Sequence, residues 1–163
     1  MTISVRPAAA GDTPAILALL GRLAEFEREP GAVTVSAETI AADGFGQRFR
    51  TLLAEEGGRT IGLANLLTAY SSWKGAPTLV IHDLFVDDDA RGAGAGHALL
   101  AAAARLARDE GCCRIDVNVL AWNAPARSFY QSLGFAPLRD WMPYRLDADG
   151  VERLAASSVR DAR

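Results

Sequence analysis

The glycine-rich segment Arg91-Gly92-Ala93-Gly94-Ala95-Gly96 constrains this chain more than any other feature. It lies between a β-rich run, residues 78–86, and an alanine-rich helical pattern from about His97 to Asp109. Alternate glycines let a ligand approach the backbone, and the free N–H groups of a helix start favour a phosphate anion. The segment therefore predicts a strand-loop-helix unit that binds a pyrophosphate, with a flexible glycine-capped loop as the alternative.

Spacing excludes two familiar nucleotide-binding loops. A P-loop needs Gly-Lys-Ser/Thr, but Gly96 is followed by His97-Ala98. The dinucleotide fingerprint G-x-G-x-x-G does not match either, because Ala95 and Gly96 shift the register. Neither ATP nor NAD is favoured.

The first half of the chain predicts helices followed by antiparallel strands. Apolar residues recur at helical spacing after Thr13-Pro14, and we expect Thr13 to cap that helix. A second short helix is expected over residues 36–42. The β-type runs 51–54 and 60–67 flank a glycine turn that is typical of a hairpin. Residues 70–77 are loop-like in composition.

The second half predicts a parallel strand pair. Residues 113–120 alternate apolar and polar side chains, and we expect this strand to run parallel to 78–86 after the crossover helix. Asn123 and Pro125 are typical of a helix start, and this helix should run through Gln131. Residues 134–146 are β-like.

Composition indicates one soluble domain over residues 1–163, with a tail that frays from about residue 150. Half the residues are hydrophobic, and 17 basic against 20 acidic side chains give a net charge of −3. This balance disfavours nucleic acid or an anionic membrane as a partner. Without an apolar run of about 18 residues or a signal-peptide pattern, a cytoplasmic location is expected.

Cysteine and histidine usage predicts no metal site. The two cysteines are adjacent, Cys112-Cys113, and we expect them to enter a buried strand as small apolar residues. The two histidines, His82 and His97, are too few for a histidine-rich cluster.

Four segments, taken in order, resemble the GCN5-related N-acetyltransferases. Residues 91–96 fit the family signature R/Q-x-x-G-x-G/A and follow a strand that ends Leu84-Phe85-Val86. Later come Trp122 to Ala126, then Ser128-Phe129-Tyr130, then Leu133-Gly134-Phe135. The resemblance implies an α/β (α+β) fold, with a mixed, mostly antiparallel sheet that has a central parallel strand pair and is flanked by helices. It also implies acetyl-CoA as co-substrate.

The same resemblance assigns coenzyme contacts and a proton donor. Backbone contacts to acetyl-CoA are implied for Leu84, Phe85, Val86, Arg91, Gly92, Ala93, Gly94, Ala95, Gly96 and His97. Further contacts are implied for Asn123, Ala124, Pro125 and Ala126. Tyr130 is implied to contact the coenzyme and to donate a proton to the departing thiolate.

Within the family, the chain is similar to the diamine (spermidine/spermine) and thialysine acetyltransferases, which implies a homodimer. The matching segments are Asp43 to Gly46, Tyr70 to Gly75 and Asp83 to Val86. Two departures remove negative charge: Ser71 and His82 stand where the polyamine enzymes carry acidic residues. This favours a small lysine-like amine over a long polycation.

Five residues are candidates for the acceptor side: Phe26, Glu27, Trp73, His82 and Asp83. Glu27 matches a substrate-facing acid of the family, with a solvated helix face as the alternative. Trp73 either packs on an amine as a cation–π partner or anchors its loop. Asp83 has a supporting role only, because successive strand residues point to opposite faces and should separate it from His82.

The expected reaction is acyl transfer from a thioester to an amine without a covalent enzyme intermediate. A lysine-type ammonium has a pKa near 10.4, so its neutral form costs roughly 4.6 kcal/mol at pH 7. His82, with an ordinary pKa near 6.5, is either the base that takes this proton or a hydrogen-bonded structural histidine. A protein amine, an antibiotic amine, or a CoA-binding module without turnover are the alternatives.

Overall fold

The computed structural model describes residues 2–157. These residues divide into two compact units, one ending at Asn118 and the other beginning at Val119, and each is described by itself. The single domain expected over residues 1–163 stays a prediction.

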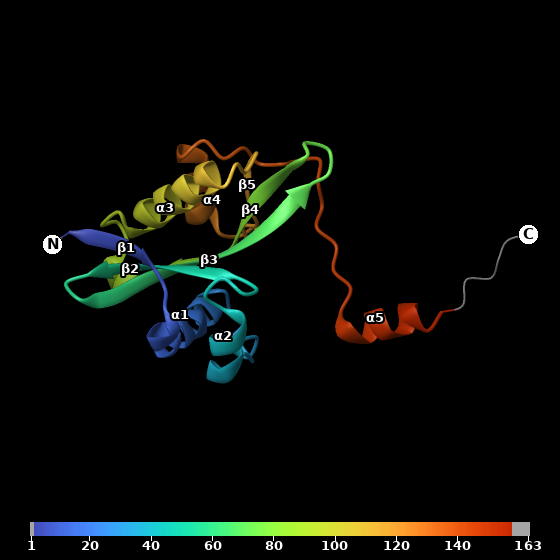
Figure 1. The fold of residues 1–163 in the computed structure, drawn as a ribbon, viewed down its shortest axis with the longest axis horizontal. Helices are drawn as coiled ribbons and strands as arrows, with labels where there is room; N and C mark the ends of the chain where they lie inside the picture. Colours follow the sequence, from blue (N-terminus) through green and yellow to red (C-terminus); the bar gives the residue numbers. More distant parts are fainter. Residues whose placement is uncertain (1, 158–163) are drawn as a thin grey trace, which may run out of the picture. The chain divides into compact units, whose positions relative to one another are not determined.

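The first unit contains a five-stranded sheet in the order β1-β2-β3-β4-β5 (Figure 1). All neighbours are antiparallel except β4 and β5, which are parallel. The predicted fold class, a mixed and mostly antiparallel sheet with one parallel pair, is therefore confirmed. The strands are β1 (Ile3–Pro7), β2 (Arg50–Glu56), β3 (Arg59–Ser71), β4 (Ala76–Val86) and β5 (Ile115–Val117).

Helices cover both faces of this sheet: α1 (Thr13–Phe26) and α2 (Ala37–Asp43) on one side, α3 (Ala95–Asp109) on the other (Figure 1). Two short 3-10 turns, η1 (Ala10–Asp12) and η2 (Asp88–Ala90), precede α1 and α3.

Helix starts follow the sequence signals closely, with one correction. The Ser36 hydroxyl accepts from the Thr39 amide and caps α2. Thr13 is not the cap of α1: Asp12 holds that position, and the Thr13 hydroxyl donates to the Ala10 carbonyl oxygen at 2.9 Å. The 3-10 turn before α1 supplies that carbonyl, which moves the boundary by one residue.

The loop expected over residues 70–77 is shorter than predicted. β3 and β4 continue as a paired hairpin out to Ser71 and Ala76. The turn closes with the Gly75 amide donating to the Ser71 carbonyl oxygen, and Gly75 has a φ of +63°, which favours glycine.

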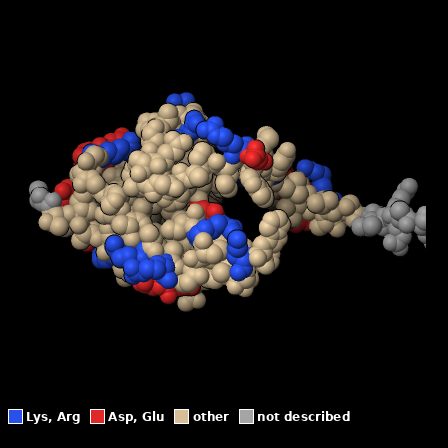
Figure 2. All heavy atoms as spheres, turned by 90° about the horizontal axis from the view of Figure 1, so that it is seen from above, with Lys and Arg blue, Asp and Glu red and all other residues tan. Residues whose placement is uncertain are grey.

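Charged side chains of both signs are interspersed over the face shown in Figure 2.

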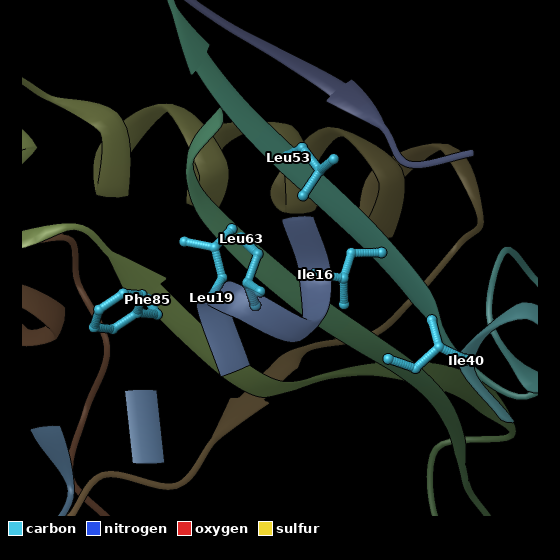
Figure 3. Packing of buried hydrophobic residues seen from close by; sticks show 6 residues of the cluster. All are labelled: Ile16, Leu19, Ile40, Leu53, Leu63 and Phe85. Atoms are coloured by element: carbon cyan, nitrogen blue, oxygen red, sulfur yellow. The ribbon is translucent and has the colours of Figure 1, made fainter. Parts of the chain in front are cut away.

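The core on the α1 side joins both helices to the sheet (Figure 3). Leu53 of β2, Leu63 of β3 and Phe85 of β4 lie directly opposite one another and form one apolar row. Burying each such side chain contributes about 1.5–3 kcal/mol, so this row holds α1 against the end of β4. The helices add Ile16, Leu19 and Ile40.

The cysteines do not enter a buried strand, so that expectation is wrong. Cys113 is exposed and Cys112 only partly buried, and both precede β5. The chain leaves α3 through Gly111 at a φ of +69°, and the Cys112 amide still donates to the Ala107 carbonyl oxygen. The helix ending uses these residues, which leaves β5 shorter than the predicted 113–120.

The second unit contains α4 (Ala124–Ser132) and α5 (Ala148–Ala155). The strand predicted at residues 134–146 is absent. After the turn that ends α4, these residues pair with none of the described strands. Apolar side chains there are exposed, and Pro137 and Pro143 have no N–H for a ladder. Part of the predicted frayed tail is helical in α5, and residues 158–163 lie outside the described residues.

Candidate active site

The glycine-rich loop connects η2 to α3 and has the backbone geometry that an anion site needs. Gly92 and Gly94 have φ values of +82° and +97°, a region that L side chains rarely adopt. Gly94 is also the N-cap of α3 and offers no capping side chain. A Cβ at either glycine would meet nothing within 4 Å, so the space beside the loop is open. The helix-start amides and this open space fit a diphosphate such as that of acetyl-CoA.

The three acidic residues that precede the loop, Asp87, Asp88 and Asp89, are each paired with an arginine. Arg91 lies 2.8 Å from Asp88, and Arg59 lies 2.9 Å from Asp89. Arg22 Nε lies 3.2 Å from the buried Asp87 Oδ1, without hydrogen-bond geometry. This pairing reduces the repulsion that bare carboxylates would exert on a bound phosphate.

The Arg91 side chain is used within the protein. Its Nε donates to the Val86 carbonyl oxygen at 3.1 Å, and its guanidinium lies 4.6 Å from the Phe26 ring centre and 5.6 Å from that of Phe85. It therefore ties the loop to β4 and α1. Phe26 and Phe85 also line an open cleft of about 540 Å³ with Arg22, Glu25, Arg59 and the three aspartates.

A β-bulge at His82 brings together two side chains that the sequence was expected to separate. Asn65 pairs with Asp83 while Leu66 pairs with Ile81, so His82 has no partner on β3. A bulge interrupts the alternation of faces, and His82 Nδ1 lies 3.2 Å from Asp83 Oδ1. The expectation that this pair points to opposite faces is wrong.

Glu27, just after α1, belongs to the same acidic neighbourhood. Partial burial, followed by the negative charge of Asp83, raises the pKa of the Glu27 carboxyl. A cation beside the Glu27 carboxyl would offset both the burial and the charge of Asp83 that disfavour its ionised form.

Two further residues, Thr51 and Asn65, extend this neighbourhood, and sequence analysis missed them. The Thr51 hydroxyl donates to Asn65 Oδ1 at 2.5 Å, and Asn65 Nδ2 donates to Asp83 Oδ2 at 2.9 Å. The available signal was Asn65 itself, an amide in the middle of the apolar run Ile61 to Leu67.

Trp73 lies at the tip of the β3–β4 hairpin and is 95% exposed. At about 3.3 Å per residue, the strand from Ala76 to Asp83 spans roughly 20 Å. Within one chain, Trp73 is therefore far from Asp83 along the strand.

In the second unit, α4 has the predicted start. Asn123 Oδ1 accepts from the Ala126 amide at 3.2 Å, and Pro125 lies in the first turn. Ala124 begins the helix.

Tyr130 is buried near the end of α4 and contacts the rings of Phe129 and Phe135. Burial raises the pKa of its hydroxyl to about 12. Against a thiol pKa near 8.5, complete transfer of this proton is uphill by about 5 kcal/mol. A hydroxyl with so high a pKa stays protonated at neutral pH and can donate a hydrogen bond.

The family is established by comparison with known proteins. The Acetyltransferase (GNAT) family matches residues 16–135, which is most of the chain. The chain belongs to this family and is an acetyl-CoA-dependent N-acetyltransferase. The resemblance inferred from the sequence is thereby confirmed.

Relatives and solved structures agree with this assignment. Thialysine N-epsilon-acetyltransferase of Bos taurus is 32% identical over 94% of this chain and 97% of its own length. Human spermidine/spermine N(1)-acetyltransferase-like protein 1 is 31% identical over 93% of this chain but only 23% of its own length. An integron cassette protein from the V. cholerae mobile metagenome, 23% identical, shares the fold with a TM-score of 0.81 over 96% of this chain and 99% of its own.

None of the helices between residues 2 and 157 is long and apolar enough to cross a membrane. Over the same residues, no group of three or more His, Cys, Asp or Glu side chains has a metal-binding arrangement.

Proposed function

We propose that this enzyme acetylates the primary amine of a small lysine-like molecule by direct attack on acetyl-CoA. The observation that carries the proposal is the acidic neighbourhood of Glu27 and Asp83. Asp83 lies in β4, only a few residues before the glycine-rich loop. A carboxyl whose pKa is raised by a neighbouring carboxylate gains by binding an ammonium group. The relatives named thialysine N-epsilon-acetyltransferase support the same acceptor class.

The coenzyme site combines the end of β4 with the loop before α3. Main-chain groups of residues 84–86 hold the pantetheine arm, and those of residues 91–97 hold the diphosphate. Positive-φ glycines and the uncapped start of α3 support this assignment. Residues 123–126 at the start of α4 are proposed as a further coenzyme contact.

His82 is the proposed general base. Its side chain is 64% exposed, so an incoming amine can reach the ring, and Asp83 lies beside Nδ1. The ammonium proton passes to the imidazole, and the neutral nitrogen attacks the thioester carbonyl. The Tyr130 hydroxyl then hydrogen-bonds the thiolate that leaves.

The amount of acidic charge favours a short acceptor. Ser71 and His82 replace two acids of the polyamine enzymes, which leaves Glu27 and Asp83 for the cation. A lysine-like molecule presents one side-chain ammonium to this pair, whereas a polyamine has further charges without partners.

We also propose that the enzyme is a cytoplasmic homodimer that binds neither nucleic acid nor membranes. Tyr70 and Trp73, exposed on the hairpin tip, support a contact with a second copy. The interspersed charges of Figure 2 and the net charge of −3 support the proposal that neither nucleic acid nor an anionic membrane is a partner.

The test is thiol release from acetyl-CoA with a panel of amines: thialysine, lysine, spermidine, an aminoglycoside and a peptide with a free N-terminus. We expect kcat/KM for the lysine-like amines to exceed that for spermidine by at least about tenfold. A preference for the peptide or the aminoglycoside would assign a different acceptor class. Coenzyme binding without thiol release from any amine would favour a non-catalytic module.

A further inference from the structure

A row of polar side chains crosses three strands on the α1 side of the sheet. Thr51 of β2 lies directly opposite Asn65 of β3, and Asn65 lies directly opposite Asp83 of β4. Residues two apart on a strand share a face. The polar row is therefore next to the apolar row of the core, which is formed by Leu53, Leu63 and Phe85.

The hydrogen bonds of this row run in one direction. An ionised carboxylate can only accept, so the Asn65 amide must present its nitrogen to Asp83. The Asn65 oxygen is then left for the Thr51 hydroxyl, which donates to it at 2.5 Å. Asp83 thereby sets the orientation of the amide, the Thr51 hydroxyl holds the amide in place from its other end, and Asp83 Oδ2 receives a fixed donor at 2.9 Å.

Burial makes this orientation costly to change. Thr51 and Asn65 are 3% and 5% exposed, and an amide turned the other way would leave buried polar atoms without partners. Asp83 is less buried, at 24% side-chain exposure, so the row ends at a carboxylate that faces both the interior and the site.

The second oxygen of Asp83 faces His82. Oδ1 lies 3.2 Å from His82 Nδ1, across the bulge in β4. A carboxylate beside Nδ1 favours the tautomer with its proton on that nitrogen and leaves a lone pair on Nε2. Glu27, just after α1, is the other carboxyl near this group, and the charge of Asp83 acts on it.

We propose that Asn65, held in place by Thr51, is a positioning residue that fixes Asp83 so that His82 keeps its proton on Nδ1 and accepts the amine proton at Nε2. The inference rests on the proposed role of His82 as base. The ammonium loses its proton to Nε2, the imidazolium is balanced by Asp83, and the proton then passes to water.

The first test measures the tautomer of His82 by NMR on protein labelled with ¹⁵N-histidine. The chain has only two histidines, and the signal lost in His82→Ala identifies the ring. We expect the Nδ1–H form in the parent and a shift towards Nε2–H in Asn65→Leu. An Nε2–H form in the parent, or no shift in the variant, would overturn the proposal. This readout needs no turnover, so it is separate from the acetyl-transfer hypothesis.

The second test uses kinetics and matched variants. We expect Asn65→Leu to lower kcat about tenfold without changing the KM for acetyl-CoA, and to lower it no further in a His82→Ala background. Equal falls in both backgrounds would mean that Asn65 does not act through His82. Thr51→Val should give a smaller shift of the same kind, and Thr51→Ser should restore the parent behaviour.

A matched control separates positioning from damage to the sheet. Thr78→Val removes a hydroxyl from a residue of β4 that is 2% exposed and outside the row. It should leave the His82 tautomer unchanged and kcat within about twofold. If Asn65→Leu fails to fold, Thr51→Val decides the question by the same tautomer measurement, and an unchanged tautomer there overturns the proposal.

Discussion

The glycine-rich loop and the bulged part of β4 contribute to the site in different ways. The loop works through its main chain, so its requirements, positive-φ glycines and a helix start, lie within residues 91–97. The bulge works through side chains from separate strands: His82 and Asp83 from β4, Asn65 from β3 and Thr51 from β2. A main-chain site is local in sequence, whereas a side-chain cluster depends on register.

The largest effect on activity is expected from a change in the side-chain cluster at the bulge of β4. His82→Ala should lower kcat at neutral pH by about 100-fold, within the usual range for a general base. The KM for acetyl-CoA should stay unchanged, because the coenzyme site uses other groups. A pH–rate profile for the variant that matches the parent's would remove His82 from the mechanism.

The main-chain site in the glycine-rich loop is tested by a pair of glycine variants. Gly94→Ala should weaken acetyl-CoA binding about tenfold, measured by calorimetry, because its φ of +97° is strained for alanine and a Cβ would enter the open ligand space. Gly58→Ala is the control, since Gly58 has a φ of +80° in the β2–β3 turn and equally open surroundings. Similar losses of stability with different coenzyme affinities are expected; equal affinities would contradict the loop assignment.

These two parts of the site also differ in how far the sequence predicts them. Residues 91–96 identify the loop, the strand before it and the helix after it, and all three are present in the structure. The contact between His82 and Asp83 is not predictable from alternation, because the bulge depends on how β3 and β4 pair. Asn65 and Thr51 are far apart in sequence, and only the strand register makes them neighbours.

The incorrect strand at residues 134–146 has a related cause. Trp141 and Tyr144 have β propensity, but a strand also needs a partner edge for its main-chain hydrogen bonds. The sequence pattern shows the side chains of this segment, but it does not show whether a partner strand lies beside it. Cys113 has a different cause: its amide donates to the Pro77 carbonyl oxygen of β4, but α3 ends shortly before it and β5 begins only at Ile115.

A smaller effect is expected at Tyr130. Tyr130→Phe should lower kcat by about three- to tenfold with little change in KM, because the variant loses only a hydrogen bond to the leaving thiolate. Burial raises the pKa of the hydroxyl to about 12, so the parent should show no loss of rate attributable to Tyr130 ionisation below about pH 11. Phe129→Leu, a change to the neighbouring ring, is the packing control; equal turnover in Tyr130→Phe would show that the hydroxyl is dispensable.

The smallest effect concerns the stability of the acidic neighbourhood. The pKa of Glu27 is raised on folding, so its contribution to stability is fully present below the unfolded pKa and is lost as pH rises through the folded one. Glu27→Gln mimics the protonated form, so it should slightly raise the unfolding midpoint at pH 7 and leave it unchanged at pH 4.

The KM for the amine should rise a few-fold at pH 7, because the ammonium loses one of its two acids. Glu29→Gln, an exposed change two residues further along the chain, is the control. A destabilised Glu27→Gln protein with unchanged KM would show that the carboxylate has a structural partner and does not bind the acceptor.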